Sequence, residues 1–207
     1  MPYIKKIKLD EGIIGIWEKT ETKEDFNSII TELVNDSRYK KITYQKRKVE
    51  FLATRALLAN LIGVYTPIHY KDDGCPFLKV KNLNISISHS ENLIAIILHK
   101  KKAGIDVEAL GRPLEKIANK FLSEKEIDFI NNSESKEKTL LLSWCVKEAV
   151  FKIINEQEIN FKNQIIIEPY ITDNKGEINV AFYSANKSQH IRLNYFFFKN
   201  NAIVWCV

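Results

Sequence analysis

The order of apolar and polar positions divides the chain into two stretches of similar plan. In the first stretch, residues 13–17 are a predicted strand, and apolar residues recur at helical spacing over 23–34 and 46–61. Polar and apolar residues alternate at 84–89, which predicts a half-buried strand that turns into an apolar strand at 93–99. This half therefore leads from helices into a terminal hairpin.

The second stretch repeats this order with different residues. Ser123 is a predicted helix N-cap with Glu126 at the capping-box position. The predicted helices are 114–121, 123–131 and 137–155, and the predicted strands are 164–168, 177–183, 191–198 and 202–207. We therefore expect an α+β fold: a pseudo-twofold pair of similar α/β lobes, 1–102 and 103–207, each with helices on a mainly antiparallel sheet.

Bulk properties narrow the classes of protein. The chain has 207 residues, 45% of them hydrophobic, which is enough for one domain or two small lobes. Its net charge of +5 suits an anionic ligand or an acidic protein partner, but it is well short of a nucleic-acid-binding signature. The longest aliphatic stretch, 93–98, is too short to span a bilayer, residues 1–6 do not resemble a secretory signal, and three scattered cysteines fit a reducing cytoplasm.

Two segments carry the candidate chemistry. On the predicted strand 104–108 (GIDVE), Asp106 and Glu108 point to the same face. On the predicted helix, Trp144, Glu148 and Lys152 follow one another at intervals of four. Three convergent carboxylates beside lysines suggest Mg²⁺ holding a phosphorylated ligand. Solvated strand carboxylates and a simple Glu–Lys pair on the helix are the alternative.

The residues that flank these carboxylates favour the metal-binding interpretation over the alternative. The segments 104–108 and 144–152 (WCVKEAVFK) resemble the signature of the 4′-phosphopantetheinyl transferases, a G-[IV]-D-[IVL]-E strand followed by a W-x-x-K-E-[AS]-x-x-K helix. Three more segments resemble the larger, surfactin-synthetase-activating branch of that family. They are 50–55 (EFLATR), 86–90 (SISHS) and 119–126 (NKFLSEKE).

The resemblance implies a fold and a reaction. Members of this branch are single chains of two similar halves with coenzyme A in the cleft between them, so we expect a monomer. A serine of an apo acyl or peptidyl carrier protein attacks the β-phosphate of coenzyme A. The phosphopantetheine arm is transferred to the serine, and adenosine 3′,5′-bisphosphate leaves.

The resemblance also implies roles for the acidic and basic residues of the two motifs. Asp106, Glu108 and Glu148 would bind Mg²⁺, with Mn²⁺ as an alternative. Glu148, alone or through a metal-bound water, would accept the serine proton. Lys147 and Lys152 would contact phosphate, although an exposed ion pair with Glu148 is the other interpretation of Lys152.

Further residues are assigned to the nucleotide end of coenzyme A. His89 would contact a phosphate, with a structural histidine as the alternative, and Ser88 would either donate to the same phosphate or simply fill the strand end. Arg55 would bind the 3′-phosphate through its planar fork. The basic cluster 46–48 would add to this field or form only a solvated face. Trp144 is predicted to pack in the core beneath the metal site.

The chain departs from the family pattern at two positions. In the loop 74–78 (GCPFL), Cys75 stands where the family has lysine, and Lys71 or Lys79 could supply the missing charge. Thr54 stands where glycine is usual. Cys75 as a nucleophile is disfavoured because phosphoryl transfer needs no covalent intermediate and no partner histidine is evident.

The family also implies a carrier-protein surface that meets an acidic helix. Ile117, Lys120, Phe121 and Leu122 resemble the carrier-facing segment of the family, and the charges of Lys116 and Lys120 would steer the encounter. Core packing is the alternative for Phe121 and Leu122. Two other functions stay open: a non-catalytic module that binds coenzyme A or a carrier, and a basic nucleic-acid-binding domain, which the composition supports little.

Overall fold

The structure is a computed structural model that describes residues 4–20, 26, 33, 36–154, 156, 158–185 and 187–207. The predicted helix at 23–34 lies outside the described residues except for Phe26 and Leu33, which are both buried. The chain divides into two compact units, Met1–Lys101 and Lys102–Val207. The predicted α+β class is confirmed, since each unit packs helices on an antiparallel sheet.

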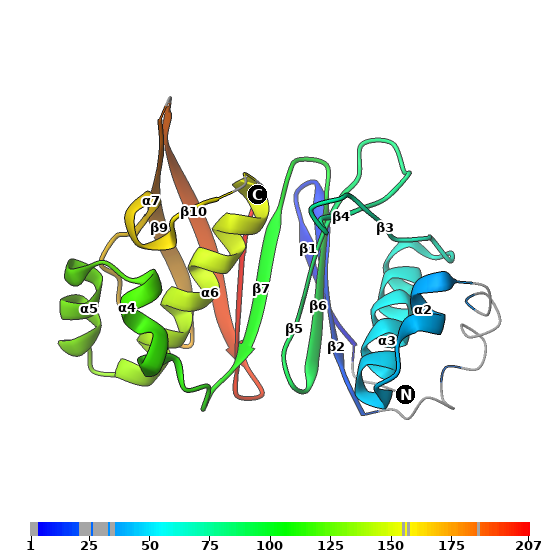
Figure 1. Cartoon of the computed structure of the whole chain (residues 1–207), viewed down its shortest axis with the longest axis horizontal. Coiled ribbons are helices and arrows are strands. Elements are labelled where there is room, and N and C mark those ends of the chain that lie inside the picture. The colour runs from blue at the N-terminus through cyan, green and yellow to red at the C-terminus, as the bar shows by residue number, and fades with distance from the viewer. Residues whose placement is uncertain are drawn as a thin grey trace. The chain divides into compact units, whose positions relative to one another are not determined.

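The N-terminal unit has a four-stranded sheet in the order β1-β2-β6-β5, a two-stranded β3-β4 ribbon and two described helices (Figure 1). Its elements are β1 (Ile4–Leu9), β2 (Gly12–Glu18), α2 (Ser37–Lys41), α3 (Gln45–Ile62), β3 (His69–Tyr70), β4 (Pro76–Phe77), β5 (Asn84–His89) and β6 (Leu93–His99). Neighbouring strands are antiparallel.

Helix α3 packs directly on this sheet. A Cβ atom on Gly15 of β2 would lie only 2.8 Å from the side-chain methyl groups of Leu61 and 2.9 Å from that of Leu57 in α3, which shows how closely the helix packs on the sheet. The helix ends at Gly63, whose φ of +91° is the left-handed conformation that glycine adopts readily. The predicted helix at 46–61 is therefore confirmed, and it buries the middle of its length against β2 and β6.

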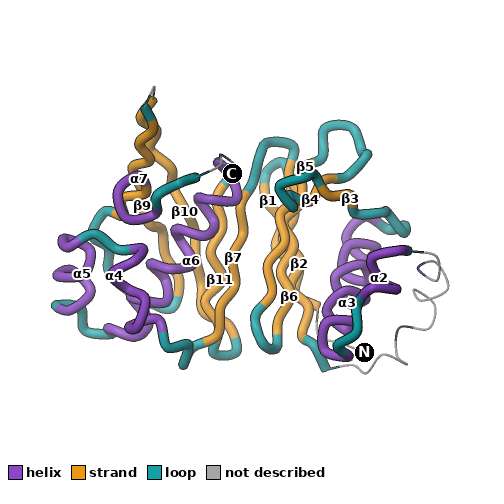
Figure 2. Tube along the Cα trace, viewed as in Figure 1, coloured by secondary structure: helices purple, strands orange, loops and turns teal. Residues whose placement is uncertain are grey.

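The C-terminal unit has a five-stranded sheet in the order β7-β11-β10-β9-β8, with its helices gathered on one face (Figure 2). Its elements are β7 (Gly104–Ala109), the 3₁₀ helix η2 (Leu114–Ile117), α4 (Ala118–Phe121), α5 (Glu124–Asn131), α6 (Lys136–Ile154), α7 (Phe161–Gln164), β8 (Ile165–Ile167), β9 (Lys175–Ser184), β10 (Lys187–Phe198) and β11 (Asn201–Cys206). Strands β10 and β11 meet at a turn in which Lys199 and Asn200 both have positive φ.

The two units share one pattern of connections. In the N-terminal unit, β2 is followed by α3 and by the hairpin β5–β6, and β6 returns to pair with β2. In the C-terminal unit, β7 is followed by α6 and by the hairpin β10–β11, and β11 returns to pair with β7. This shared order fits the duplication suggested by the hydrophobic pattern.

Several features differ from the predicted elements. The helix predicted at 114–121 is a 3₁₀ turn followed by one short α-helical turn. The short helices α2 and α7, strand β1 and the β3–β4 ribbon were not predicted. The capping box of Ser123 and Glu126 is present at the start of α5, as predicted. In the part of the chain that the structure describes, no helix is both long and apolar enough to cross a membrane.

Candidate active site

Strand β7 and helix α6 approach each other closely at a glycine. A Cβ on Gly104 would lie 2.0 Å from the carbonyl oxygen of Ala149, so the side chain of any other residue would push the helix away. Because residues two apart on a strand share a face, Asp106 and Glu108 point toward the same helix. The helix presents Trp144, Glu148 and Lys152 there, which brings the two motifs together at one junction.

Asp106 is held by the lysine of the helical motif. The Lys152 Nζ donates to Asp106 Oδ1 at 2.8 Å and to the carbonyl oxygen of Ile105 at 2.9 Å. Asp106 is only 4% exposed. Lys152 therefore pairs with the strand carboxylate rather than merely with Glu148 on its own helix.

Cys145 lies next to this pair. Burial, and then the charge and hydrogen bond of Asp106, hold the pKa of the Cys145 thiol well above its ordinary value. Cys206 is also buried, which raises its thiol pKa to about 12. Both thiols therefore stay protonated near neutral pH and are poor nucleophiles.

Glu148 is half-buried at the same junction. Burial and the negative charge of Asp106 raise the pKa of its carboxyl above 4.5, while Lys152 and Arg112 partly counteract them. A carboxylate with a raised pKa is a better proton acceptor near neutral pH than an ordinary one. We call Asp106, Glu108, Glu148 and Lys152 the acidic site.

Glu108 has two partners that the sequence did not suggest. Arg112 Nη1 donates to its Oε1, and so does the indole Nε1 of Trp144, at 3.1 Å. The Trp144 ring also packs edge-on against Phe121, with the ring centroids 4.9 Å apart. Trp144 thus packs partly in the core, as predicted, and also binds the carboxylate of Glu108.

Two of the three predicted metal ligands have basic partners in this structure. Within the described ranges, no three His, Cys, Asp or Glu side chains are grouped so that they could hold a metal ion. Asp106 is paired with Lys152, and Glu108 with Arg112. Carboxylate oxygens remain the donors that Mg²⁺ prefers, so the residue types fit, but an ion would have to replace these basic partners.

Lys147 is placed differently from the prediction that it contacts phosphate. Its side chain is 0% exposed, and its Nζ donates to Glu126 Oε2 at 2.9 Å and to the carbonyl oxygens of Phe161 and Ile165 at 2.9 and 2.7 Å. Burial lowers the pKa of Lys147, which Glu126 partly offsets. All three N–H donors of the ammonium group are engaged, so we do not include Lys147 among the ligand contacts.

The N-terminal unit contains a cavity of about 520 Å³, lined only by residues between 41 and 89. Arg55 of α3 and His89 at the end of β5 both line it, so the structure brings these two predicted nucleotide contacts together. Ser88 is buried in β5 and is not among the lining residues. We call this the basic cavity.

Arg55 is the most deeply buried cation of the basic cavity, at 3% exposure. Its Nη1 donates to the carbonyl oxygen of Phe51 at 3.1 Å, and its guanidinium lies 3.2 Å from the centre of the Phe51 ring. Among the described residues Nη2 has no acceptor in hydrogen-bond geometry, although Tyr70 lies nearby. Burial lowers the pKa of Arg55, but an arginine side chain remains charged in proteins. The cavity therefore has a positively charged side chain in its wall, which favours an anionic ligand.

Glu50 organises the mouth of the cavity. It accepts from Lys19 Nζ at 3.0 Å and from Arg47 Nη1 at 2.8 Å. Burial alone would raise the pKa of Glu50, but Lys19, His89 and Arg47 together lower it. Sequence reasoning missed this role, although Glu50 begins the segment 50–55 that carries the family resemblance.

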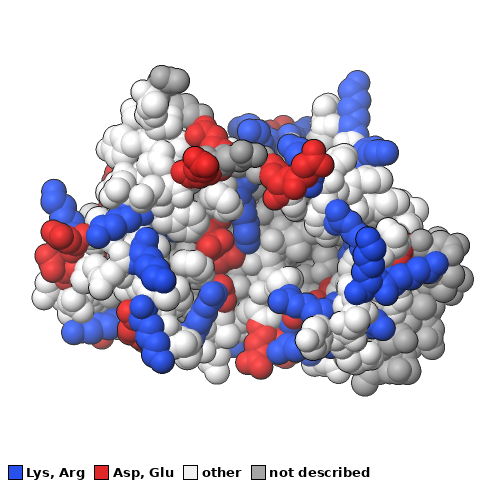
Figure 3. Space-filling view, in the orientation of Figure 1, with Lys and Arg blue, Asp and Glu red and all other residues white. Residues whose placement is uncertain are grey.

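Basic side chains gather over α2 and the start of α3 (Figure 3). They are Arg38, Lys40, Lys41, Lys46, Arg47 and Lys48. In the cluster 46–48, Arg47 lines the cavity. Lys46 instead places its Nζ 3.7 Å from Oε1 of the exposed Glu91. The charge of this face would attract an anionic ligand toward the cavity.

The loop that departs from the family pattern borders the cavity. Gly74 and Pro76 line it, and the backbone N–H of Cys75 donates to the Asp73 carboxylate at 2.8 Å. Lys71 and Lys79 are exposed and are not among the lining residues.

Thr54, which stands where the family has glycine, also lines the cavity, and its hydroxyl donates to the Glu50 carbonyl at 2.7 Å. The hydroxyl is thus occupied by its own helix. The methyl group of this residue adds bulk that glycine would not bring to the helix surface.

The segment predicted to face a carrier protein is mostly core. Phe121 and Leu122 are buried, and Ile117 packs partly against the same core. Lys116 and Lys120 are exposed. The core interpretation therefore holds for the two large apolar residues, and the two lysines are the accessible part of the segment.

Comparisons with known proteins agree with the motifs at the acidic site. Residues 102–206, just over half of the chain, match the model of the 4′-phosphopantetheinyl transferase superfamily. A protein of Haemophilus influenzae, named provisionally as a 4′-phosphopantetheinyl transferase, is 29% identical over 96 residues. That match covers 44% of this chain and 41% of the relative. The chain belongs to the 4′-phosphopantetheinyl transferase superfamily.

Proposed function

We propose that this protein transfers the 4′-phosphopantetheine arm of coenzyme A to a serine of an apo acyl or peptidyl carrier protein. The serine oxygen forms a bond to the β-phosphorus, the bond from that phosphorus to the bridging oxygen breaks, and adenosine 3′,5′-bisphosphate leaves. The observation that carries the proposal is the junction of β7 and α6, where both family motifs bring Asp106, Glu148 and Lys152 together.

Glu148 is the proposed acceptor of the serine proton. Its raised pKa makes it a stronger base than an ordinary carboxylate, and its neighbour Lys152 supplies positive charge beside it. Lys152 is also the proposed phosphate contact of the acidic site, since its side chain is partly exposed while it pairs with Asp106.

Mg²⁺ is the proposed metal, held by Asp106 and Glu148, with Glu108 joining if it leaves Arg112. When bound, such an ion offsets negative charge on the diphosphate and on the leaving oxygen. In the structure, Lys152 forms an ion pair with Asp106, and Arg112 forms one with Glu108. We propose that Lys152 and Arg112 turn toward phosphate oxygens when the ion and coenzyme A enter together.

The basic cavity is the proposed site for the phosphorylated nucleotide end of coenzyme A. Arg55 places a buried positive charge in the wall of the cavity, and the exposed His89 lines the same cavity near Glu50. A planar guanidinium suits the two oxygens of a phosphate monoester. Arg55 and His89 are therefore the proposed contacts, and Ser88 and Lys147 are left out because neither lines the cavity.

The test is incubation of the purified protein with apo carrier proteins of its host, coenzyme A and Mg²⁺, followed by intact mass measurement. We expect a gain of one phosphopantetheine group on a carrier, which disappears when coenzyme A is omitted or EDTA is added. Repeating the reaction with Mn²⁺ compares the two metals. Unmodified carriers throughout would overturn the proposal.

The pairing of Asp106 and Glu108 with basic side chains favours one alternative, a non-catalytic module that binds coenzyme A or a carrier protein. Titration calorimetry with coenzyme A distinguishes the two. Binding of coenzyme A without transfer to any carrier would establish the module, whereas binding with transfer establishes the enzyme.

A further inference from the structure

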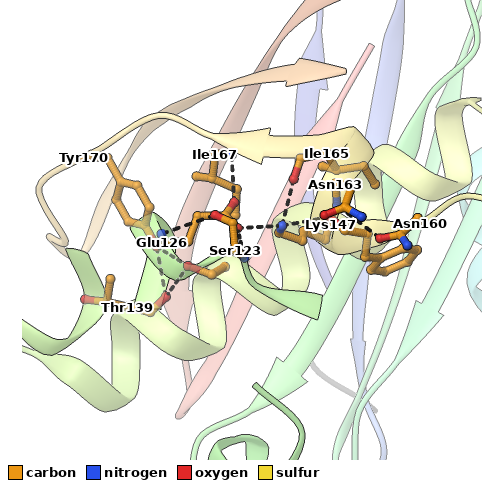
Figure 4. A network of polar contacts seen from close by, with 11 residues as sticks. Ser123, Glu126, Thr139, Lys147, Asn160, Asn163, Ile165, Ile167 and Tyr170 are labelled. Atoms are coloured by element: carbon orange, nitrogen blue, oxygen red, sulfur yellow. Dashed lines mark hydrogen bonds and ion pairs between the residues drawn. The ribbon is translucent and has the colours of Figure 1, made fainter. Parts of the chain in front are cut away.

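The buried lysine beside Glu148 belongs to a network that joins four elements (Figure 4). At the start of α5, Glu126 Oε2 accepts from the Ser123 backbone N–H at 2.7 Å and from the Ser123 hydroxyl at 2.9 Å. The same oxygen accepts from Lys147 Nζ, and the other carboxylate oxygen accepts from the Ile167 N–H of β8, at 2.9 Å each. Glu126 thus connects α5, α6 and β8.

Lys147 extends these connections to α7. Its other two donors bind the carbonyl oxygens of Phe161 in α7 and Ile165 in β8. The ammonium group is therefore held in three directions by groups outside its own helix. Such a group resists movement along the helix axis and rotation about it.

A buried ion pair of this kind is not favoured for stability alone. Burying both charges costs free energy that the attraction between them offsets only partly, and an apolar pair of similar volume is often as stable. What a fully hydrogen-bonded pair does provide is a single geometry, because each donor has one acceptor in place. The network therefore specifies how α6 is rotated.

The rotation of α6 determines where Glu148 and Lys152 lie. Lys147 and Glu148 are consecutive, so their side chains leave the helix about 100° apart. For a side-chain atom roughly 6 Å from the helix axis, a rotation of about 10° displaces it by about 1 Å. A displacement of about 1 Å can lower a rate about a hundredfold when groups must meet in one geometry.

We propose that Lys147 and Glu126 are a positioning pair that fixes the rotation of α6 and so holds Glu148 and Lys152 against Asp106. This proposal rests on the transferase activity proposed above. Neither member of the pair contacts substrate, because Lys147 is fully buried and the Glu126 carboxylate is occupied by Ser123, Ile167 and Lys147.

The first test compares two lysines of α6. For Lys147→Met we expect kcat to fall about 10- to 100-fold, while the Kd for coenzyme A changes less than twofold. Exposed Lys136 at the start of the same helix provides the matched control, and Lys136→Met should leave both quantities unchanged. A weaker Kd with normal kcat would show Lys147 to be a ligand contact, and an unchanged kcat would also overturn the pair.

A second variant separates positioning from stability. Lys147→Met leaves the Glu126 charge buried without its lysine, so we expect a lower thermal midpoint. Adding Glu126→Gln removes that charge, which should restore part of the midpoint while kcat stays low, because the contacts to Phe161 and Ile165 are still missing. Recovery of kcat along with the midpoint would overturn positioning in favour of a purely structural role.

A third measurement does not depend on activity. Amide hydrogen exchange of residues 144–152 should be faster in Lys147→Met than in the wild type or in Lys136→Met. Wild-type protein that modifies no carrier would refute the proposed function, and the exchange result would still decide whether the pair holds the helix. Unchanged exchange in the Lys147→Met variant would overturn the positioning pair.

Discussion

The basic cavity and the acidic site differ in how far the protein satisfies its own charges. In the cavity, Nη2 of Arg55 has no hydrogen-bonded acceptor among the described residues. In the acidic site, Asp106 is paired with Lys152 and Glu108 with Arg112 and Trp144. Arg55 thus has no carboxylate within ion-pair distance among the described residues, whereas the two strand carboxylates of the acidic site must exchange basic partners to bind an ion.

This difference suggests a division of work under the proposed function. A cation without a carboxylate partner contributes to affinity because no ion pair has to be broken when an anionic ligand binds. Groups that change partners during the reaction contribute to the rate when the new contacts are stronger in the transition state. Variants of the cavity should therefore change Kd, and variants of the acidic site should change kcat.

The largest effect is expected for Glu148→Gln. Glutamine keeps the shape but cannot accept the serine proton, so transfer to a carrier should fall about a hundredfold to ten-thousandfold. The Kd for coenzyme A in the absence of metal should change little. Quantitative mass spectrometry of the carrier gives the rate, and Glu134→Gln at an exposed position is the control. A rate near that of the wild type would remove Glu148 from the proposed chemistry.

A smaller effect, on coenzyme A binding rather than on the transfer rate, is expected for Arg55→Met. Loss of charged hydrogen bonds to phosphate should weaken coenzyme A binding about 10- to 100-fold, measured by calorimetry. At saturating coenzyme A, kcat should stay close to that of the wild type. Arg192→Met, on an exposed part of β10, is the matched control. If kcat fell while Kd stayed the same, the contrast between the two regions would be wrong.

Two glycines sharpen the comparison at the level of packing. A Cβ on Gly104 would lie 2.0 Å from Ala149 O, and a Cβ on Gly12 would lie 2.3 Å from Leu98 O. Each alanine variant should lose about 1–3 kcal/mol of unfolding free energy, measured with urea. Only Gly104→Ala should also lower the transfer rate per folded molecule, because it moves α6 away from β7. Equal loss of rate in both variants would argue against a special role for this junction.

The smallest effect is a gain in stability. The pKa of Glu148 is raised by burial and Asp106, so ionised Glu148 destabilises the folded state at neutral pH. Glu148→Gln should therefore raise the thermal midpoint by a few degrees near pH 7, in the order expected for about 1 kcal/mol. The gain should shrink as the pH falls through the raised pKa and vanish below about 4, where glutamate is protonated in both the folded and the unfolded state. An equal gain at all pH values would contradict the assigned cause.

Sequence patterns predicted the elements whose structure is determined by residues close together in the chain. The alternation at 84–89 and the capping box at Ser123 are each determined within a few residues, and both are present. Strand β1 was missed because its lysines mask the alternation, and such charges are usual on an edge strand. The helix predicted at 114–121 is divided equally between a 3₁₀ turn at 114–117 and an α-helical turn at 118–121, a division that the apolar spacing does not indicate.

The candidate site was predictable only in part, because some of its contacts join residues that are far apart in the chain. The spacing of Asp106 and Glu148 within their motifs placed them on facing elements, and they do meet. Lys147 was misassigned because its partners lie elsewhere in the chain: Glu126 is 21 residues away and Ile165 is 18. No pattern around Lys147 indicates that it is buried, and none around Glu108 indicates its bond to Trp144.

The unequal exposure of the three thiols has a practical use. Cys145 and Cys206 are buried, while Cys75 is partly accessible in the loop whose neighbours Gly74 and Pro76 line the basic cavity. A maleimide dye applied to the native protein should attach at this one position, with no engineering required. A dye attached to Cys75 of the wild-type protein would thus report on ligand entry into the basic cavity.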